Sequence, residues 1–348
     1  MFQKPRPPFR PAAPALLRRR DLLLGGALAG LALAGARFGP AGPIGAAAAA
    51  PALNQAPYFH RFRIGEMLGT VVSDGVLPLG DPTASFFGPS EDEMRAMLTR
   101  NFLAPDAAVL EQNILVLDAG DRRVLFDTGM GSSQMFGPTP GKLMETLAAA
   151  GIDPASIDAI VCTHAHCDHV WGIMSDAGER HFPNAQIYLS EADFDYWTDE
   201  AKLGVSDPAW MAAFVEGARA NLLPNRDRLH FFADGEEFLP GIQALAAPGH
   251  TVGHTAFLLT SGGNSFAVIG DLTHHHVILL ERPMTQFAFD TDPEQSARTR
   301  VRVLDMLAAQ RVPMIAYHFP WPGLGHVEKV GEGFRWHPMP MVMQELPG

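Results

Sequence analysis

The segment Thr163-His164-Ala165-His166-Cys167-Asp168-His169 decides how this chain is interpreted. His164 and His166 are two positions apart, so an extended turn after a strand can direct both imidazole rings toward one ion. Asp168 and His169 are adjacent and point in different directions, which suits a second ion beside the first. Imidazole and carboxylate donors without thiolate favour Zn²⁺, with Mn²⁺, Fe²⁺ or Co²⁺ as alternatives. The segment therefore predicts a site for two divalent metal ions.

Two later motifs supply further donors. One is Pro248-Gly249-His250-Thr251-Val252-Gly253-His254, and the other is Gly270-Asp271-Leu272-Thr273-His274. The glycines beside His250 and Asp271 permit tight turns and a close approach of the backbone. Asp271 can bridge two cations, because a carboxylate offers two oxygens. We therefore expect His250 and Asp271 to complete the site together with the late His318.

Other polar residues near these motifs are predicted to support the ligands. His254, Thr163 and Asp127 can fix ligands by hydrogen bonding, although an ordinary turn would also explain Asp127. The triple His274-His275-His276 offers three more imidazoles. Alternating side-chain directions argue against all three reaching a metal, so none of them is included among the predicted ligands.

Predicted strands and helices alternate along the chain, as in a layered α/β fold. The donors His164, His250, Asp271 and His318 each follow a predicted strand. Donors at the carboxyl ends of strands are the usual site placement in α/β sheets. The predicted strands span residues 112–117, 123–126, 159–162, 186–189, 242–246, 255–259, 266–269 and 314–317, and the predicted helices span 141–150, 191–196, 208–222 and 293–310.

These motifs resemble a known superfamily. T-H-x-H-x-D-H at residues 163–169, G-H-T at 249–251, G-D at 270–271 and a late His318 are the pattern of metallo-β-lactamase-fold hydrolases. The resemblance implies an αββα sandwich of two mixed sheets packed between helices, with the site at one edge. It also implies that one metal is held by His164, His166 and His250, the other by Asp168, His169 and His318, and that Asp271 bridges them.

A narrower resemblance covers most of residues 57–340. The segments 136–139, 244–255, 286–292, 322–326 and 333–336 are similar to those of the methyl parathion hydrolase group and its lactonase-like relatives. Val252 departs from this group, which often has proline there, but it lies outside the ligand set. The resemblance implies a hydrolase that attacks lactones, aryl esters or organophosphate triesters with a metal-bridging hydroxide.

Some residues are predicted to have roles beyond metal binding. Asp168 and Asp271 are candidates for relaying a proton, in addition to binding metal. Phe136, Trp197 and Phe214 fall where the relatives have substrate-binding residues, which predicts an aromatic pocket rim. Core packing is the alternative explanation for each of these aromatic residues.

Three other functions are weighed against this one. An exported β-lactamase is the main enzymatic alternative, but the zinc β-lactamases do not keep an aspartate at the position of Asp271. A nuclease is disfavoured because the chain has a net charge of −12, and phosphate binding needs a basic surface. A non-catalytic metal-binding protein would be expected to have lost ligands, and all seven are present. The predicted partner is therefore a small-molecule ester, lactone or phosphotriester and not nucleic acid, and a homodimer is left open.

Residues 1–36 have the features of an export signal. Arg18-Arg19-Arg20 precede an apolar run at 22–34, which ends in Ala34-Gly35-Ala36, a typical cleavage site. The run is shorter than the roughly 20 residues of a membrane span, and the adjacent arginines are similar to a twin-arginine signal. We expect a periplasmic or secreted protein with a signal at 1–36 (the cut alternatively lying as late as residue 50), a linker at 37–56 and one hydrolase domain at 57–348.

The chain contains two cysteines, Cys162 and Cys167. A disulfide is common for a cysteine pair in an exported protein. These two flank the end of a predicted strand and the loop in which His164 and His166 must converge. We therefore expect two free thiols.

Overall fold

The computed structural model describes residues 59–205, 208 and 210–341. These residues belong to the compact unit Gln55–Gly348. The predicted export signal and linker lie outside the described residues, so they stay predictions, as does the domain boundary at residue 57. None of the helices in the described ranges is long and apolar enough to cross a membrane.

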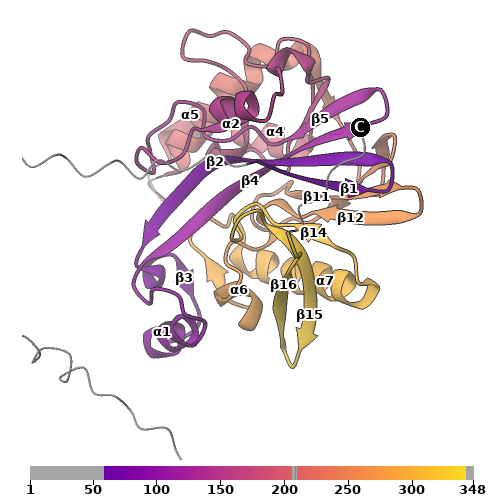
Figure 1. Ribbon diagram of the computed structural model, residues 1–348. Coiled ribbons are helices and arrows are strands. Elements are labelled where there is room, and N and C mark those ends of the chain that lie inside the picture. Colours follow the sequence, from indigo (N-terminus) through magenta and orange to yellow (C-terminus); the bar gives the residue numbers. More distant parts are fainter. Residues whose placement is uncertain (1–58, 206–207, 209, 342–348) are drawn as a thin grey trace, which may run out of the picture. The chain divides into compact units, whose positions relative to one another are not determined.

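Two large mixed sheets form the centre of this unit (Figure 1). In sheet 1, β1, β2, β4 and β5 are antiparallel neighbours, and β5 to β8 run parallel. Its strands, in spatial order, are β1 (Phe59–Ile64), β2 (Met67–Gly80), β4 (Ala108–Ala119), β5 (Arg122–Phe126), β6 (Ala159–Val161), β7 (Gln186–Leu189) and β8 (Leu229–Phe231).

Sheet 2 is antiparallel except for one parallel pair, β12 with β14, which sets Ala267 opposite Met314. Its strands, in spatial order, are β16 (Gly333–Pro338), β15 (Leu324–Val330), β14 (Met314–Ile315), β12 (Asn264–Val268), β11 (Thr255–Ser261), β10 (Ile242–Ala246) and β9 (Glu237–Leu239). A separate small pair joins β3 (Phe86–Phe87) to β13 (Gln286–Phe287).

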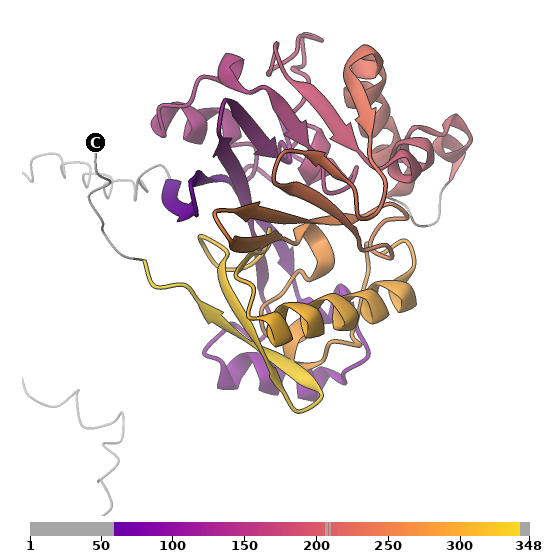
Figure 2. The ribbon, with the colours of Figure 1, turned by 90° about the vertical axis from the view of Figure 1, so that its right-hand side faces the viewer.

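Helices cover the outer faces of the two sheets, whereas α1 packs separately with α6 and β3. In Figure 1, α2, α4 and α5 lie on one side and α6 and α7 on the other, and Figure 2 shows α7 beside the strands of sheet 2. The helices are α1 (Glu91–Arg100), α2 (Leu143–Ala149), α3 (Cys167–Val170), α4 (Glu191–Thr198), α5 (Met211–Leu222), α6 (Ile278–Glu281) and α7 (Pro293–Gln310), with short 3₁₀ turns η1 (Pro82–Ala84), η2 (Pro154–Ser156), η3 (Glu200–Gly204), η4 (Leu223–Arg228) and η5 (Gly270–Leu272).

The strand sequences explain this layering. In β4, Ile114 and Val116 pack toward the helices over sheet 1, whereas Leu115 and Leu117 join the core between the sheets. Successive side chains of a strand point to opposite faces, so a continuous apolar run is buried on both. A third apolar cluster packs α7 against sheet 2. The predicted αββα sandwich with two mixed sheets is therefore confirmed.

Both cysteines are buried and free. Cys162 follows β6, and Cys167 begins α3, so both join the apolar core on the helical side of sheet 1. The prediction of two free thiols is confirmed.

Candidate metal centre

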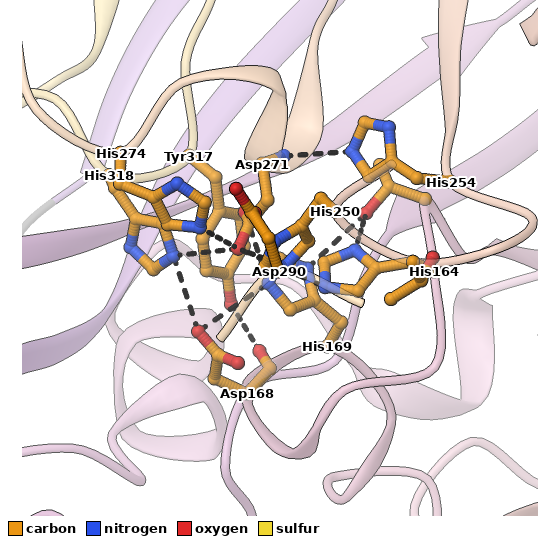
Figure 3. A network of polar contacts seen from close by, with 12 residues as sticks. His164, Asp168, His169, His250, His254, Asp271, His274, Asp290, Tyr317 and His318 are labelled. Atoms are coloured by element: carbon orange, nitrogen blue, oxygen red, sulfur yellow. Dashed lines mark hydrogen bonds and ion pairs between the residues drawn. The ribbon is translucent and has the colours of Figure 1, made fainter. Parts of the chain in front are cut away.

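The predicted donors converge from both sheets at one end of the sandwich. His164 and His166 follow β6 of sheet 1, and His166 is the residue before the single turn of α3 that carries Asp168 and His169. Three strands of sheet 2 supply the others: His250 follows β10, Asp271 follows β12 and His318 follows β14. All seven side chains are buried (Figure 3 labels six of them).

The donors form two groups. The ligand atoms of His164, His166 and His250 lie within 4.8 Å of one another, and so do those of Asp168, His169, Asp271 and His318. Asp271 lies between the groups: its Oδ1 is 3.2 Å from His169 Nε2, and its Oδ2 is 3.3 Å from His250 Nε2. This grouping is the one that the family resemblance implied.

The chemistry of these atoms fits metal ions. The Nε2 atoms of His164, His166 and His169 are buried without a hydrogen-bond partner. Burial lowers the pKa of His164 and His166 well below the usual value, so each ring stays neutral and keeps a lone pair. An unpartnered buried nitrogen costs free energy, which a cation would relieve. No thiol belongs to either group of described donors, so the site suits divalent ions of the zinc type.

The opposite ring nitrogens are held by acceptors. His169 Nδ1 donates to Asp127 Oδ2 at 2.9 Å, and His250 Nδ1 donates to Asp290 Oδ1 at 2.8 Å. His318 Nδ1 donates to the carbonyl oxygen of Glu111, on β4 of sheet 1, at 2.8 Å. Each bond fixes the plane of its ring and leaves Nε2 facing the other donors.

Asp127 has more than a turn role. It adopts a left-handed backbone conformation with φ of 63°, which is uncommon for a residue other than glycine. Its carboxylate accepts hydrogen bonds from the Thr163 amide at 2.8 Å and the Thr163 hydroxyl at 2.9 Å, as well as from His169. The predicted supporting roles of Thr163 and Asp127 are therefore seen in the structure.

His254 supports Asp271 through the backbone. Its Nδ1 donates to the Ala247 carbonyl at 3.1 Å, and its Nε2 accepts from the Asp271 amide at 3.0 Å. A Cβ at Gly270, whose φ is +49°, would lie 2.8 Å from this Nε2. Glycine is therefore required beside Asp271, as predicted.

Asp193 is a buried carboxylate that sequence reasoning missed. It accepts hydrogen bonds from the amides of Ala165 and Gly253, at 2.9 and 2.6 Å, and from the Thr251 hydroxyl at 2.9 Å. Burial raises its pKa to about 6, although these hydrogen bonds act to lower it. Asp193 thus joins the two histidine-bearing loops. Its place in a predicted helix gives no sign of this role. The sequence likewise indicates no role for Asp290, in the segment 286–292.

The three consecutive histidines have different surroundings. His274 reaches the metal centre, where its Nε2 lies 3.0 Å from Asp271 Oδ2. His275 turns away and accepts the amides of Val277 and Ile278 at the start of α6. His276 packs near Phe319 and Trp336. One of the three therefore joins the donors, forming a further group with His250 and Asp271.

A narrow cavity of about 30 Å³ lies beside the donors. A larger hollow of about 730 Å³ lies near α7 and β15, but none of the histidines or acidic residues that line it is buried. The cavity beside the donors has an apolar wall formed by β2, β4, the loop before α2, α5 and the segment around β13. The wall consists of Leu77, Leu79, Leu110, Phe136, Phe214, Phe287 and Phe289. Among the described residues, no lysine or arginine lines this cavity.

Two of the three aromatic residues predicted to bind substrate lie in this wall, namely Phe136 and Phe214. The third prediction needs correction. Trp197 is fully buried and packs edge-on against His166, with ring centroids 4.7 Å apart, and it does not line the cavity. The reason is that α4 turns this position inward, into the core shared with Phe214.

Comparison with known proteins agrees with this geometry. The pattern of the metallo-beta-lactamase superfamily matches residues 107–335. Two solved structures each cover 82% of this chain and 99% of their own. AidC, a dizinc quorum-quenching lactonase in complex with a product, is 27% identical with a TM-score of 0.77, and the hydrolase AbOPH is 28% identical with a TM-score of 0.76.

The curated relatives match over shorter stretches. The beta-lactamase-like protein 2 homolog of Drosophila melanogaster is 28% identical over 45% of this chain and 47% of its own length. The metallo-hydrolase mfmC of Annulohypoxylon moriforme is 29% identical over 53% of this chain and 52% of its own. The chain thus spans about half the length of these relatives. Because the superfamily pattern covers most of the chain and contains the whole donor set, the chain belongs to the metallo-beta-lactamase superfamily.

Proposed function

We propose that this protein is a metal-dependent hydrolase that cleaves lactones, aryl esters or organophosphate triesters. The observation that carries the proposal is the pair of buried donor groups joined by Asp271 beside an apolar cavity. Similarity to AidC, a dizinc lactonase, supports lactones as the first class to test. In this proposal the ligands are His164, His166, Asp168, His169, His250, Asp271 and His318.

The chain's own residues contribute donors held in fixed positions and the charged groups around them. When bound, two ions supply Lewis acidity and a water that ionises near neutral pH. Burial opposes ionisation of Asp271, but His318, His169 and His274 hold its pKa well below the usual range. Its carboxylate is therefore charged and able to contact both donor groups. Asp168, whose Oδ2 lies 3.4 Å from His318 Nε2, is the second candidate for a proton relay.

The cavity wall supports a neutral substrate. A charged group that enters an apolar cavity loses hydration and needs an opposite charge in compensation. The wall is aliphatic and aromatic, and the charged side chains beside it are the donors themselves. A lactone, aryl ester or phosphotriester is neutral, whereas a β-lactam antibiotic carries a carboxylate. The wall therefore favours the ester classes over the β-lactamase alternative.

A hydrolysis panel tests this proposal. Zinc-loaded protein is assayed with a γ-lactone, N-hexanoyl homoserine lactone, p-nitrophenyl acetate, paraoxon and the β-lactam nitrocefin. We expect turnover of at least one neutral ester class and none of nitrocefin. Asp271→Ala should lower turnover on the order of 100-fold or more, because supporting residues alone are worth about 10–100-fold. The matched control Arg298→Met alters an exposed side chain on α7 and should keep full activity. Nitrocefin as the only substrate, or an active Asp271→Ala, would refute the proposal.

A further inference from the structure

An arginine is buried next to the metal centre. Arg300, on α7, is fully buried and is among the largest side chains with no exposure. Burial lowers its pKa to about 10, which still leaves the guanidinium charged at neutral pH. A buried charge costs several kcal/mol unless hydrogen bonds or an opposite charge compensate it. The retention of a charge here needs an explanation beyond packing.

The guanidinium compensates its burial with backbone carbonyls from two loops. Its Nε donates to the Leu272 carbonyl at 3.0 Å, immediately after Asp271. Its Nη1 donates to the carbonyls of Pro283 and Thr285, at 2.7 and 2.8 Å. One side chain thus joins η5, which carries Asp271, to the segment that leads into β13.

That second segment shapes the cavity and supports a ligand. Phe287 and Phe289 belong to the apolar wall, and Asp290 holds His250 through the 2.8 Å bond to Nδ1. Asp290 Oδ2 is buried without a hydrogen-bond partner. Arg300 therefore contacts both the loop that carries Asp271 and the segment that leads to Asp290, the hydrogen-bond partner of His250.

We propose that Arg300 is a positioning residue that holds the Asp271 loop and the segment 283–290 in one fixed relation, so that the metal donors and the aromatic wall are set together. A planar guanidinium has five donors spread over a fork, which suits carbonyls that approach from different loops. A lysine ammonium is a compact point charge and cannot span the same acceptors. The inference rests on the proposed function, because it takes the donors to bind metal.

Substitution of Arg300 tests this inference. The variants are Arg300→Lys, which keeps the charge, and Arg300→Met, with Arg298→Met as the control on the exposed face of the same helix. Zinc affinity is measured by chelator competition, and hydrogen exchange is measured on the metal-free proteins. For Arg300→Lys we expect about tenfold weaker zinc binding and a higher KM for an aryl ester. Relative to the wild type, hydrogen exchange should increase more at residues 270–274 and 283–290 than in the rest of the chain. The control should match the wild type.

The outcomes distinguish failure of this inference from failure of the proposed function. If Arg300→Lys keeps wild-type zinc affinity and KM, or if exchange rises equally over the whole chain, Arg300 has only a structural role and the inference is overturned. If Arg300→Met does not fold, Arg300→Lys alone decides between these outcomes. Failure of the wild type to bind zinc would instead overturn the proposed function, while the exchange pattern in the metal-free variants still tests the link between the two loops.

Discussion

Aromatic residues near the metal centre differ in what their side chains contact. Trp197 is fully buried behind His166, whereas Phe136 is partly exposed and lines the cavity. Both lie close to the donors, so proximity does not separate a fully buried residue from one that lines the cavity. The direction in which the backbone turns each side chain does separate them.

Truncation should distinguish the two residues. Trp197→Ala leaves a cavity in the core, at a cost of about 3–5 kcal/mol of unfolding free energy, and should reduce efficiency on aryl and aliphatic esters alike. Phe136→Ala should leave the melting temperature nearly unchanged and reduce efficiency mainly on aryl substrates, which lose contact area with the wall. Thermal denaturation and kcat/KM for both substrate types provide the measurement. A stable Trp197→Ala with a selective loss on aryl esters would contradict this assignment.

At the scale of elements, apolar periodicity predicted the buried strands and helices well. β7, β10 and α7 have the predicted bounds, and every other predicted element differs at one or both ends. β1, β2, β15 and β16 were not predicted. β2 contains Gly75 and Pro78, and its register shifts between Ser73 and Val76, whereas the outer ends of β15 and β16 are exposed and polar. A pattern based on alternating burial is weak in such strands.

The helix α1 was also not predicted, although its sequence contains a local signal for a helix start. Ser90 precedes the helix, and its side chain accepts a hydrogen bond from the Glu93 amide at 3.3 Å. Serine followed three positions later by glutamate is a common helix start. By contrast, Asp193 and Asp290 could not be assigned from spacing. Their partners are far away in the sequence, so the contacts exist only once the fold has formed.

The start of α6 should be sensitive to acid. His275 accepts two amides through Nδ1, which requires a neutral ring, and burial lowers its pKa to about 3. Because the folded pKa lies below the unfolded value of about 6.5, the unfolded state binds the proton first. The stability of this element should therefore be full above about pH 6.5 and fall as the pH drops toward 3.

Hydrogen exchange at residues 277–281 between pH 7 and 5, corrected for intrinsic rates, measures this effect. His275→Asn keeps an acceptor but removes the titrating group, so its protection in α6 should depend less on pH than that of the wild type. Equal pH dependence in the two proteins would show that other groups control this helix.

At the scale of the whole molecule, the donors join the two sheets. His164 and His166 follow a strand of sheet 1, and His250, Asp271 and His318 each follow a strand of sheet 2. This convergence was predictable, because each donor follows a buried strand and the motif spacing is distinctive. The hydrogen bonds that support the donors were predictable only for Thr163, Asp127 and His254, which lie in or beside recognisable motifs.

Metal removal should therefore destabilise the fold as a whole. An ion that binds only the folded state adds about 2.7 kcal/mol of stability at 100 times its Kd. Chelation should lower the melting temperature by several degrees, and elemental analysis of the loaded protein should give two ions per chain. Readdition of zinc should restore both quantities. An unchanged melting temperature after complete chelation would mean that metal does not link the sheets.

The position of His318 also has a consequence for how the protein is made. β14 enters the interior of sheet 2, beside the earlier strand β12, only after α7 has crossed between them. A growing chain emerges from the ribosome amino-terminal end first, so the donors from β6, β10 and β12 are exposed before β14 exists. A nascent chain that ends before β14 lacks both His318 and the strands β14, β15 and β16 of sheet 2. The second donor group therefore lacks His318 until late in translation, whereas all three members of the first group, His164, His166 and His250, have been synthesised earlier.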